Sequence, residues 1–311
     1  MSNLLAIVLP TFGLIGLGFF AGKLKLLGDR AGDGLSDYVF LIAVPALIFR
    51  TLATGADADA NPWGYWVAYF GGVAVVWSVG MWLAIRVFKR DRREAAIHGF
   101  ACGQSNTVLV GVPLILQAYG DAGAVPLFLL LAIHLPIMMS VAALLIESSG
   151  AAGRPLEVAW RLAKTIVTHP IILALAAGVA AKSAGVVPTG AARSIVDQLA
   201  ATASPCALVS MGLALKRYGI LSDRVPVLTI TALKLILHPF LVWVLAFYVL
   251  PVPPVWGGVA VLFAAMPSGI NAYLVAARYK TGETTSSAAI AVSTALSVVT
   301  VSGWLWVLGI V

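Results

Sequence analysis

Two short polar interruptions in long apolar stretches hold the residues of this chain best suited to chemistry. The first interruption reads Gly103-Gln104-Ser105-Asn106 and the second reads Pro267-Ser268-Gly269-Ile270-Asn271. Each asparagine amide offers hydrogen-bond donors and an acceptor. Beside unwound backbone and the positive N-terminal ends of half-helices, such groups suit a carboxylate. We therefore predict that Asn106 and Asn271 bind a small anionic ligand.

Glycine and proline in these interruptions predict broken helices. Both residue types free backbone groups that hydrocarbon cannot satisfy, so a break at membrane depth is tolerated only beside packed protein or a watery cavity. A matched pair of breaks indicates the substrate site of a transporter. The residues expected to shape the two breaks are Gly103, Gly111, Pro113, Pro267 and Gly269. Gln104, Ser105 and Ser268 either bind substrate or satisfy freed backbone, and the asparagines could instead cap half-helices or tie helices together.

Ionisable residues within the apolar stretches form a second candidate set. Lys234 lies among leucines and an isoleucine, and intramembrane charges usually face a cavity or a partner. We expect Lys234 to balance an anionic substrate or to position the crossed helices, unless its long side chain reaches the lipid headgroups. His98, His134 and His238 are candidates for proton coupling, although membrane histidines also bond neighbouring helices.

Acidic residues are missing beside both interruptions. Exchange of sodium for protons needs a carboxylate in such a region, so the pattern favours a neutral, electropositive pocket for an organic anion. Asp37 and Asp197 are expected near helix starts, in capping or first-turn roles. The glycine-rich run that includes Gly18 and Gly22 follows no strand, so it predicts close helix packing instead of a nucleotide site. We expect no metal and no cofactor.

Composition places the chain in lipid. Of its 311 residues 60% are hydrophobic and 11% are charged, and the mean hydropathy is +0.98, whereas soluble domains are about a quarter charged. Cys102 and Cys206 fall within apolar runs and are expected to be packing residues. Apolar runs of about 20 residues predict an all-α membrane protein with ten spans, near residues 4–22, 36–54, 64–86, 95–118, 122–146, 163–181, 195–215, 225–250, 256–277 and 285–309.

The net charge of +7 does not indicate a nucleic-acid partner, because most of the 20 lysines and arginines lie in alternate loops. Basic loops favour the cytoplasmic side, which predicts a multi-pass protein of the cell (inner) membrane with both termini on the non-cytoplasmic side. No basic region precedes the first apolar run, so we expect that run to be retained and not removed as a signal peptide.

Internal similarity predicts a duplication. Pro10 corresponds to Pro170, and residues 37–45 correspond to residues 197–205 at the same spacing. We infer two repeats of five spans, 1–150 and 151–311, joined by the polar segment 147–157. An odd number of spans inverts the second copy, so the broken fourth and ninth spans should meet face to face near the midplane.

The residues that carry these features resemble the auxin efflux carrier family, in its compact bacterial branch of candidate malonate permeases. The matching segments are Leu9-Pro10, Val44-Pro45-Ala46-Leu47, Asn106 to Leu114, Leu233-Lys234-Leu235 and Pro267 to Ala272. The resemblance implies the fold of bile-acid symporters and sodium/proton antiporters. It also implies a scaffold of spans one, two, six and seven, a transport domain of the remaining spans, elevator-like alternating access, a homodimer, and carboxylate contacts at Asn106 and Asn271.

The leading functional prediction is a secondary active or potential-driven transporter of a small mono- or dicarboxylate. Its expected partners are the substrate, membrane lipid and a second copy of the chain. Alternatives are a sodium-coupled symporter of the bile-acid type and a non-transporting membrane receptor. An intramembrane hydrolase using Ser268 and His238 is disfavoured, because Met266-Pro267 stands where the nucleophile motif needs glycine. The chain is therefore not expected to be an enzyme.

Overall fold

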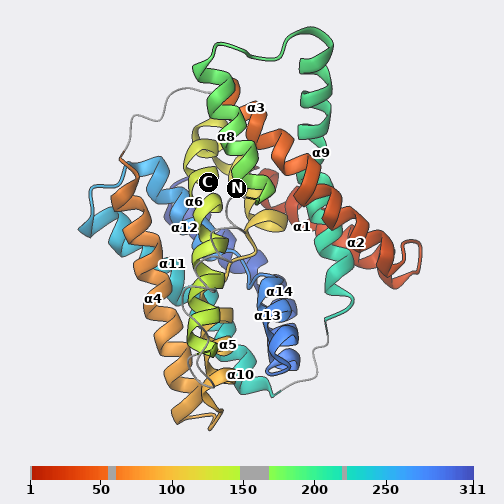
Figure 1. The fold of residues 1–311 in the computed structure, drawn as a ribbon. Coiled ribbons are helices and arrows are strands. Elements are labelled where there is room, and N and C mark those ends of the chain that lie inside the picture. The colour runs from red at the N-terminus through yellow and green to blue at the C-terminus, as the bar shows by residue number, and fades with distance from the viewer. Residues whose placement is uncertain (1, 55–60, 148–167, 219–222) are drawn as a thin grey trace.

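The computed structural model describes residues 2–54, 61–147, 168–218 and 223–311, and in that part of the chain helices provide the regular structure (Figure 1). The α-helices are α1 (Ser2–Lys23), α2 (Asp29–Tyr38), α3 (Val44–Thr54), α4 (Pro62–Arg86), α5 (Arg92–Gly103), α6 (Val112–Glu147), α8 (Pro170–Ser183), α9 (Gly190–Leu215), α10 (Arg224–Ala232), α11 (His238–Val244), α12 (Pro254–Ala265), α13 (Asn271–Tyr279) and α14 (Glu283–Val307). Short π-helical turns join some of them, namely η1 (Val39–Ala43), η2 (Thr107–Gly111), η3 (Leu233–Leu237) and η4 (Leu245–Val249).

Seven helical stretches within the described residues are long and apolar enough to cross a membrane, which makes the chain a multi-pass all-α membrane protein. They are Leu4–Lys23, Asp29–Thr54, Pro62–Arg86, Thr107–Glu147, Gly190–Leu215, Arg224–Val249 and Glu283–Val307, and Pro170–Ser183 and Pro254–Ala265 are shorter apolar helices. The count of ten spans and the inverted repeat remain predictions. Nearly all of the expected repeat boundary, 147–157, lies outside the described residues.

The region predicted as spans four and five has a different division from the one expected. Helix α5 ends at Gly103, and a continuous helical stretch then runs from Thr107 to Glu147. Within this stretch Gly120 has φ 55° and ψ −142°, a backbone conformation that glycine adopts without the penalty of a Cβ atom. The two predicted spans are therefore joined by a sharp bend at one glycine and not by a longer loop.

Three π-helical turns have a cause that can be read in the sequence. η1, η2 and η3 each end two residues before a proline, at Pro45, Pro113 and Pro239. A proline ring in a helix clashes with the carbonyl four residues earlier and cannot donate a backbone hydrogen bond. Each carbonyl concerned lies inside the π-helical turn, where the wider winding relieves the clash.

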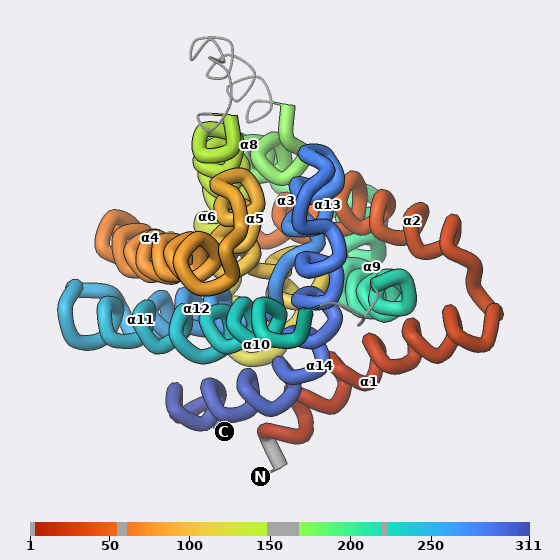
Figure 2. The backbone as a smooth tube through the Cα atoms, turned by 90° about the horizontal axis from the view of Figure 1, so that it is seen from below, coloured from red at the N-terminus to blue at the C-terminus, as the bar shows by residue number. Residues whose placement is uncertain are grey.

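The helices pack in two groups that mix the two halves of the sequence. α1, α2, α3, α8 and α9 pack mainly on one another, and α4, α5, α6 and α10 to α14 form the second group. Figures 1 and 2 show α1, α2 and α9 on one side of the molecule and α4, α10 and α11 on the other. The first group contains the segments expected to form spans one, two, six and seven.

Helices α1 and α9 are in backbone contact. A Cβ atom placed on Gly18 would lie 2.2 Å from the carbonyl oxygen of Val209, and one on Gly212 would lie 2.0 Å from that of Ile15. Small residues allow such close approach between membrane helices. The packing role predicted for Gly18 is therefore confirmed, and Gly22 likewise faces Leu213 and Lys216 at van der Waals distance.

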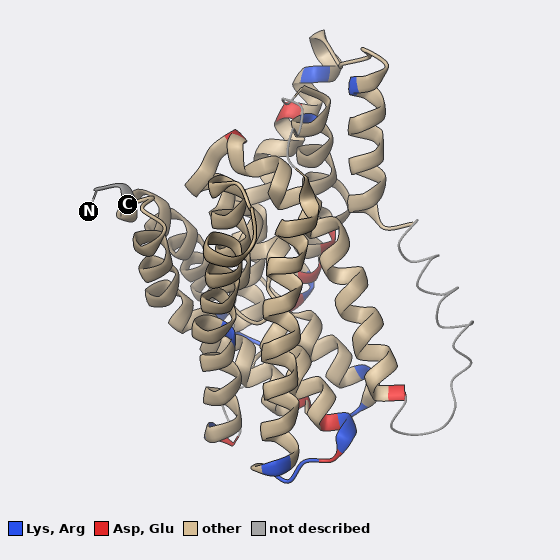
Figure 3. Cartoon of the chain, turned by 90° about the vertical axis from the view of Figure 1, so that its left-hand side faces the viewer, with Lys and Arg blue, Asp and Glu red and all other residues tan. Residues whose placement is uncertain are grey.

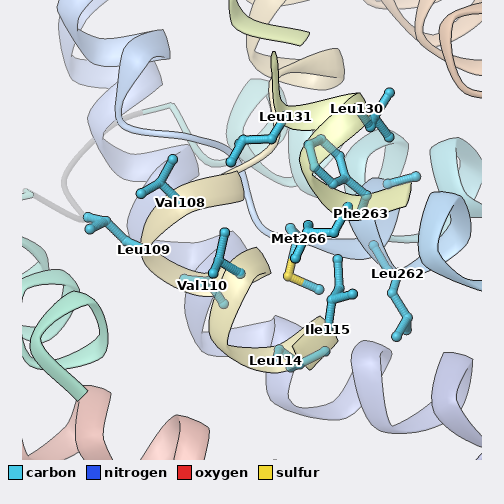
Figure 4. Packing of buried hydrophobic residues seen from close by; sticks show 14 of the residues in the cluster. Val108, Leu109, Val110, Leu114, Ile115, Leu130, Leu131, Leu262, Phe263 and Met266 are labelled. Carbon is cyan, nitrogen blue, oxygen red and sulfur yellow. The ribbon is translucent and has the colours of Figure 1, made fainter. Parts of the chain in front are cut away.

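The first interruption is surrounded by packed protein. Figure 4 shows side chains of η2 and the start of α6 against Phe263 and Met266, and the residues in this view are buried. The expectation that a break lies beside packed protein instead of lipid therefore holds. Cys102 is buried here, Cys206 is partly buried, and both are free thiols.

Charged residues lie mostly toward the lower end and the upper tip of the molecule as drawn in Figure 3. The start of α1 and the end of α14 lie side by side (Figures 2 and 3). The capping roles expected of Asp37 and Asp197 are wrong. Helix α2 already begins at Asp29, so Asp37 lies near its end, and Asp197 lies within α9, where it pairs with Arg50 at 3.8 Å and Arg193 at 3.6 Å.

Candidate functional site

The two interruptions hydrogen-bond to each other through their backbones. The amide of Asn106 donates to the carbonyl of Pro267 at 2.8 Å, and the amide of Gly269 donates to the carbonyl of Gln104 at 2.9 Å. Ser105 and Ser268 thereby form an isolated antiparallel β-bridge. Because unpaired buried backbone groups are costly, each break supplies the partners that the other one needs.

Ser268 fastens the second break to its neighbours. Its hydroxyl donates to the carbonyl of Ala101 at 2.9 Å, and its amide donates to the hydroxyl of Ser293 at 3.0 Å. It does not line the cavity described below. These contacts support the reading that Ser268 satisfies freed backbone. They also leave the hydroxyl directed away from His238, whose Nδ1 faces Lys234.

Gly269 allows the two breaks to approach. A Cβ atom at this position would lie 2.8 Å from the carbonyl oxygen of Ser105. Gly103 is similarly confined, since its Cβ would lie 3.1 Å from Val73 and 3.3 Å from Met138. Gly111 closes the first break through its amide, which donates to the carbonyl of Asn106 at 3.0 Å. The glycines predicted to shape the breaks therefore do so by close contact.

A cavity of about 620 Å³ lies between the two helix groups and against both breaks. Ser105, Asn106, Gly269 and Asn271 line it, and η2 and α13, which begin at the breaks, turn their positive N-terminal ends toward it. The opposite wall comes from α2, the start of α8 and the end of α9, with residues Asp33, Ser36, Asp37, Phe40, His169, Ile171, Ala214, Arg217 and Tyr218.

The two asparagines differ in how they are held. Asn106 is 5% exposed, and its side-chain nitrogen donates to the sulfur of Met211 at 3.0 Å, a weak acceptor. Asn271 is partly buried, and its amide side chain makes no hydrogen bond to the described residues. Both amides can therefore exchange little or nothing for a hydrogen bond to a ligand oxygen.

Charged residues in the cavity wall correct the expectation of a site without carboxylates. Asp33 and Asp37 line the cavity, together with Arg217. Arg217 donates to the carboxylate of Asp33 at 2.6 Å and also to the backbone carbonyl of Asp29. Among the described residues Asp37 has no ion-pair partner. The expectation failed because helix α2, distant in sequence from both interruptions, is brought against them by the fold.

Lys234 points into the protein and away from both lipid and cavity. It is fully buried; its ammonium nitrogen donates to the carbonyl of Ala264 and lies 3.3 Å from Nδ1 of His238. The reading in which it reaches the headgroups is therefore wrong. It does not line the cavity, so direct contact with a ligand there would need a different arrangement of the helices.

Tyr69, which sequence reasoning missed, joins the histidines to the first break. Its hydroxyl lies 3.3 Å from the hydroxyl of Ser105 and 3.2 Å from Nδ1 of His134, and its ring lies 5.3 Å from that of His238. All of these side chains are buried. No pattern in the sequence distinguishes Tyr69 from the other aromatic residues of its apolar stretch.

His98 and Gln104 lie apart from the cavity lining. The ring of His98 lies 5.6 Å from that of Phe88 and away from Tyr69 and its neighbours. The side-chain nitrogen of Gln104 donates to the carbonyl of Ser105 at 3.4 Å, so this residue also serves backbone groups at the break. Of the six residues predicted to bind substrate, the cavity is therefore lined by Asn106, Asn271 and Ser105.

The fold and the site are those of a multi-pass membrane protein with a cavity beside paired helix breaks. A family model described as "Membrane transport protein" matches residues 4–305. The chain belongs to this family, the auxin efflux carriers, as the sequence motifs predicted.

Similar proteins extend over the whole chain. It is 30% identical over 309 residues to a "Putative malonate transporter" of Rhizobium meliloti (strain 1021), covering 99% of this chain and 97% of that protein. It is 26% identical to an "Uncharacterized transporter" of Methanothermobacter thermautotrophicus, with 96% of each chain covered. A "Lysosomal cholesterol signaling protein" of Mus musculus is 24% identical over 38% of this chain and 14% of its own length. The full-length similarities indicate a membrane transporter and not an enzyme.

Proposed function

We propose that the protein is a secondary transporter of small carboxylates and that its substrate binds in the cavity beside the two breaks. The carrying observation is that breaks from distant parts of the sequence pair with each other at one cavity wall, where Asn106 and Asn271 both lie. Uncharged donors hold a carboxylate without the cost of a permanent buried charge. Ser105 is the third proposed contact.

Malonate is the substrate class with the most support. The relative from Rhizobium meliloti carries that substrate in its printed name. Arg217 adds a cation to the cavity wall opposite the asparagines, although Asp33 already pairs with it. A dicarboxylate therefore has donors at both walls, and we propose it ahead of a monocarboxylate.

Transport is proposed to follow an elevator-like movement of the second helix group against the first. The cavity lies between these groups, and hydrogen bonds that cross between them include Gln117 to the carbonyl of Ala6 at 2.9 Å and Asn106 to Met211. The first group is then the scaffold, and we propose that it also forms a homodimer. Both termini are proposed to face the non-cytoplasmic side of the inner membrane.

Malonate flux into liposomes containing the purified protein tests the assignment. We expect Asn106→Ala and Asn271→Ala each to weaken apparent malonate affinity by about 10-fold or more, since a hydrogen bond to a charged group contributes about 1.5–3 kcal/mol. Gln198→Ala removes an exposed amide on α9 that bonds Ser194, and it should leave flux unchanged.

Unchanged flux in both asparagine variants would reject the site. Malonate binding to the wild-type protein without any flux would instead favour the receptor alternative. Loss of flux in Gln198→Ala as well would show that the asparagine effects are not specific to the cavity.

A further inference from the structure

Lys234 is an unusual residue because it is fully buried without an acidic partner. Its ammonium nitrogen contacts the carbonyl of Ala264 and Nδ1 of His238, and the buried polar residues of the described chain include no aspartate or glutamate. A buried ammonium is costly unless a negative charge comes near it. The carbonyl of Ala264, at the C-terminal end of α12, supplies only part of a charge.

The surroundings of Lys234 are polar but not acidic on every side. His238 follows on the same helical stretch, and Cys102 of α5 and His134 of α6 lie within electrostatic range. From α4, the ring of Tyr69 packs on that of His238. From α14, the indole of Trp304 donates to the carbonyl of Leu235 at 3.2 Å. None of these groups is a resident counter-charge.

A short chain of contacts connects this lysine to the cavity. Ser105 lines the cavity and bonds the Tyr69 hydroxyl, and the Tyr69 ring packs on His238, whose Nδ1 lies 3.3 Å from the lysine nitrogen. Nε2 of His238 and Nε2 of His134 are buried without a hydrogen-bond partner. The cluster therefore has basic nitrogen atoms to spare and no acid of its own.

We propose that the Lys234–His238 pair binds the proton that travels with the carboxylate, which makes the protein a carboxylate–proton symporter. The inference rests on the proposed function. A carboxylate at the two breaks brings the missing negative charge, so bound substrate favours the protonated pair and the protonated pair favours bound substrate, by the same factor. One proton from water on the first side joins the nitrogen pair, and it returns to water on the second side when the carboxylate leaves.

Calorimetry of malonate binding in buffers of different ionisation enthalpy counts the protons taken up. At pH values where malonate is fully ionised, we expect the wild-type protein to take up about one proton per malonate, and its Kd to rise by up to about tenfold per pH unit. Lys234→Met should bind malonate with no proton uptake and a flat pH profile. His98→Gln, which changes a buried histidine outside the cluster, should behave like the wild type.

Liposomes containing a pH-sensitive dye test the same idea during transport. A malonate gradient should move protons with the substrate in the wild type and in His98→Gln, and replacing sodium with choline should have no effect. Lys234→Met should move no protons. If that variant does not fold, His238→Gln takes its place and should lower proton uptake on binding.

The outcomes separate the two proposals. Malonate flux without proton movement in the wild type overturns the symport inference and leaves the proposed transport function standing. Full proton coupling in folded Lys234→Met overturns the assignment to this pair. Absence of both malonate flux and malonate binding in the wild type overturns the proposed function itself.

Discussion

Asn106 and Asn271 lie on breaks that depend on each other for their backbone hydrogen bonds. The amide of Asn106 bonds the second break, and the amide of Gly269, close before Asn271, bonds the first. A change at either break therefore disturbs both asparagines. The position of each amide in the cavity is a property of the pair of breaks and not of one helix.

Gly269→Ala tests this dependence at a single residue. The added Cβ would lie 2.8 Å from a backbone oxygen of Ser105, which cannot move aside as the end of a flexible side chain could. We expect destabilisation of about 1–3 kcal/mol, typical of overpacking, together with loss of malonate flux. Thermal unfolding in detergent and flux into liposomes measure the two effects. Gly16→Ala, at a helix position with open space around it, should change neither.

An unaltered unfolding temperature and normal flux in Gly269→Ala would show that the breaks do not need their close contact. A loss in Gly16→Ala of equal size would point to a general intolerance of helical glycine changes.

At the residue scale the sequence predicted some of the site and missed the rest for a physical reason. Glycine, proline and asparagine in an apolar run mark a break by their backbone chemistry, so Asn106, Asn271 and Gly269 could be found. The direction of a side chain on a helix that is apolar all round leaves no periodic signal. That is why the burial of Lys234, the role of Tyr69 and the carboxylates of α2 had to come from the fold.

Among the helices, α1 and α9 form the tightest contact described above. Gly18 and Gly212 face each other's helix backbones, at distances that no side chain would permit. The sequence indicated a packing role for Gly18, because a dinucleotide loop would need a preceding strand. Its partner helix could not be inferred, since glycine-rich packing signals do not name the surface they face.

Gly212→Val is expected to separate α1 from α9. Its Cβ would lie 2.0 Å from the carbonyl oxygen of Ile15 and 2.7 Å from the amide nitrogen of Phe19, both backbone atoms. We expect the unfolding temperature in detergent to fall, with a loss of at least 1–3 kcal/mol. Gly13→Ala, at a position of α1 with no atoms nearby, is the matched control and should unfold like the wild type. Equal stability of the two variants would contradict backbone contact between α1 and α9.

The element boundaries show what composition can and cannot establish. Apolar runs located the helices well, and prolines at positions 45, 113 and 239 mark where three of them widen into π-helical turns. The bend at Gly120 was read as a loop between two spans, because a single glycine in a helical run signals either a break or mere packing. Only tertiary context decides between these outcomes.

At the scale of the whole molecule, the two helix groups each draw segments from both halves of the chain. Their membership agrees with the scaffold and transport domain that the family resemblance implied. The inverted relation between the halves stays a prediction, since the expected junction lies largely outside the described residues. The cavity between the groups could not be predicted in shape, because it depends on how they pack and not on the order of their helices.

The proposed elevator movement predicts that tying the two groups together stops transport. Gln117 of α6 bonds the carbonyl of Ala6 in α1, and both residues are exposed. In a background without Cys102 and Cys206, Ala6→Cys with Gln117→Cys, joined by a short thiol-reactive spacer, should abolish malonate flux, and reductive cleavage of the spacer should restore it. The matched pair Asp29→Cys with Lys216→Cys joins two exposed positions within the first group, where an ion pair of 3.3 Å now lies, and should leave flux intact. Each single-cysteine variant treated with the same reagent controls for modification alone. Because a rigid tie between the groups cannot coexist with sliding of one past the other, full flux in the completely cross-linked Ala6→Cys, Gln117→Cys protein would contradict the elevator and require a gate within one group.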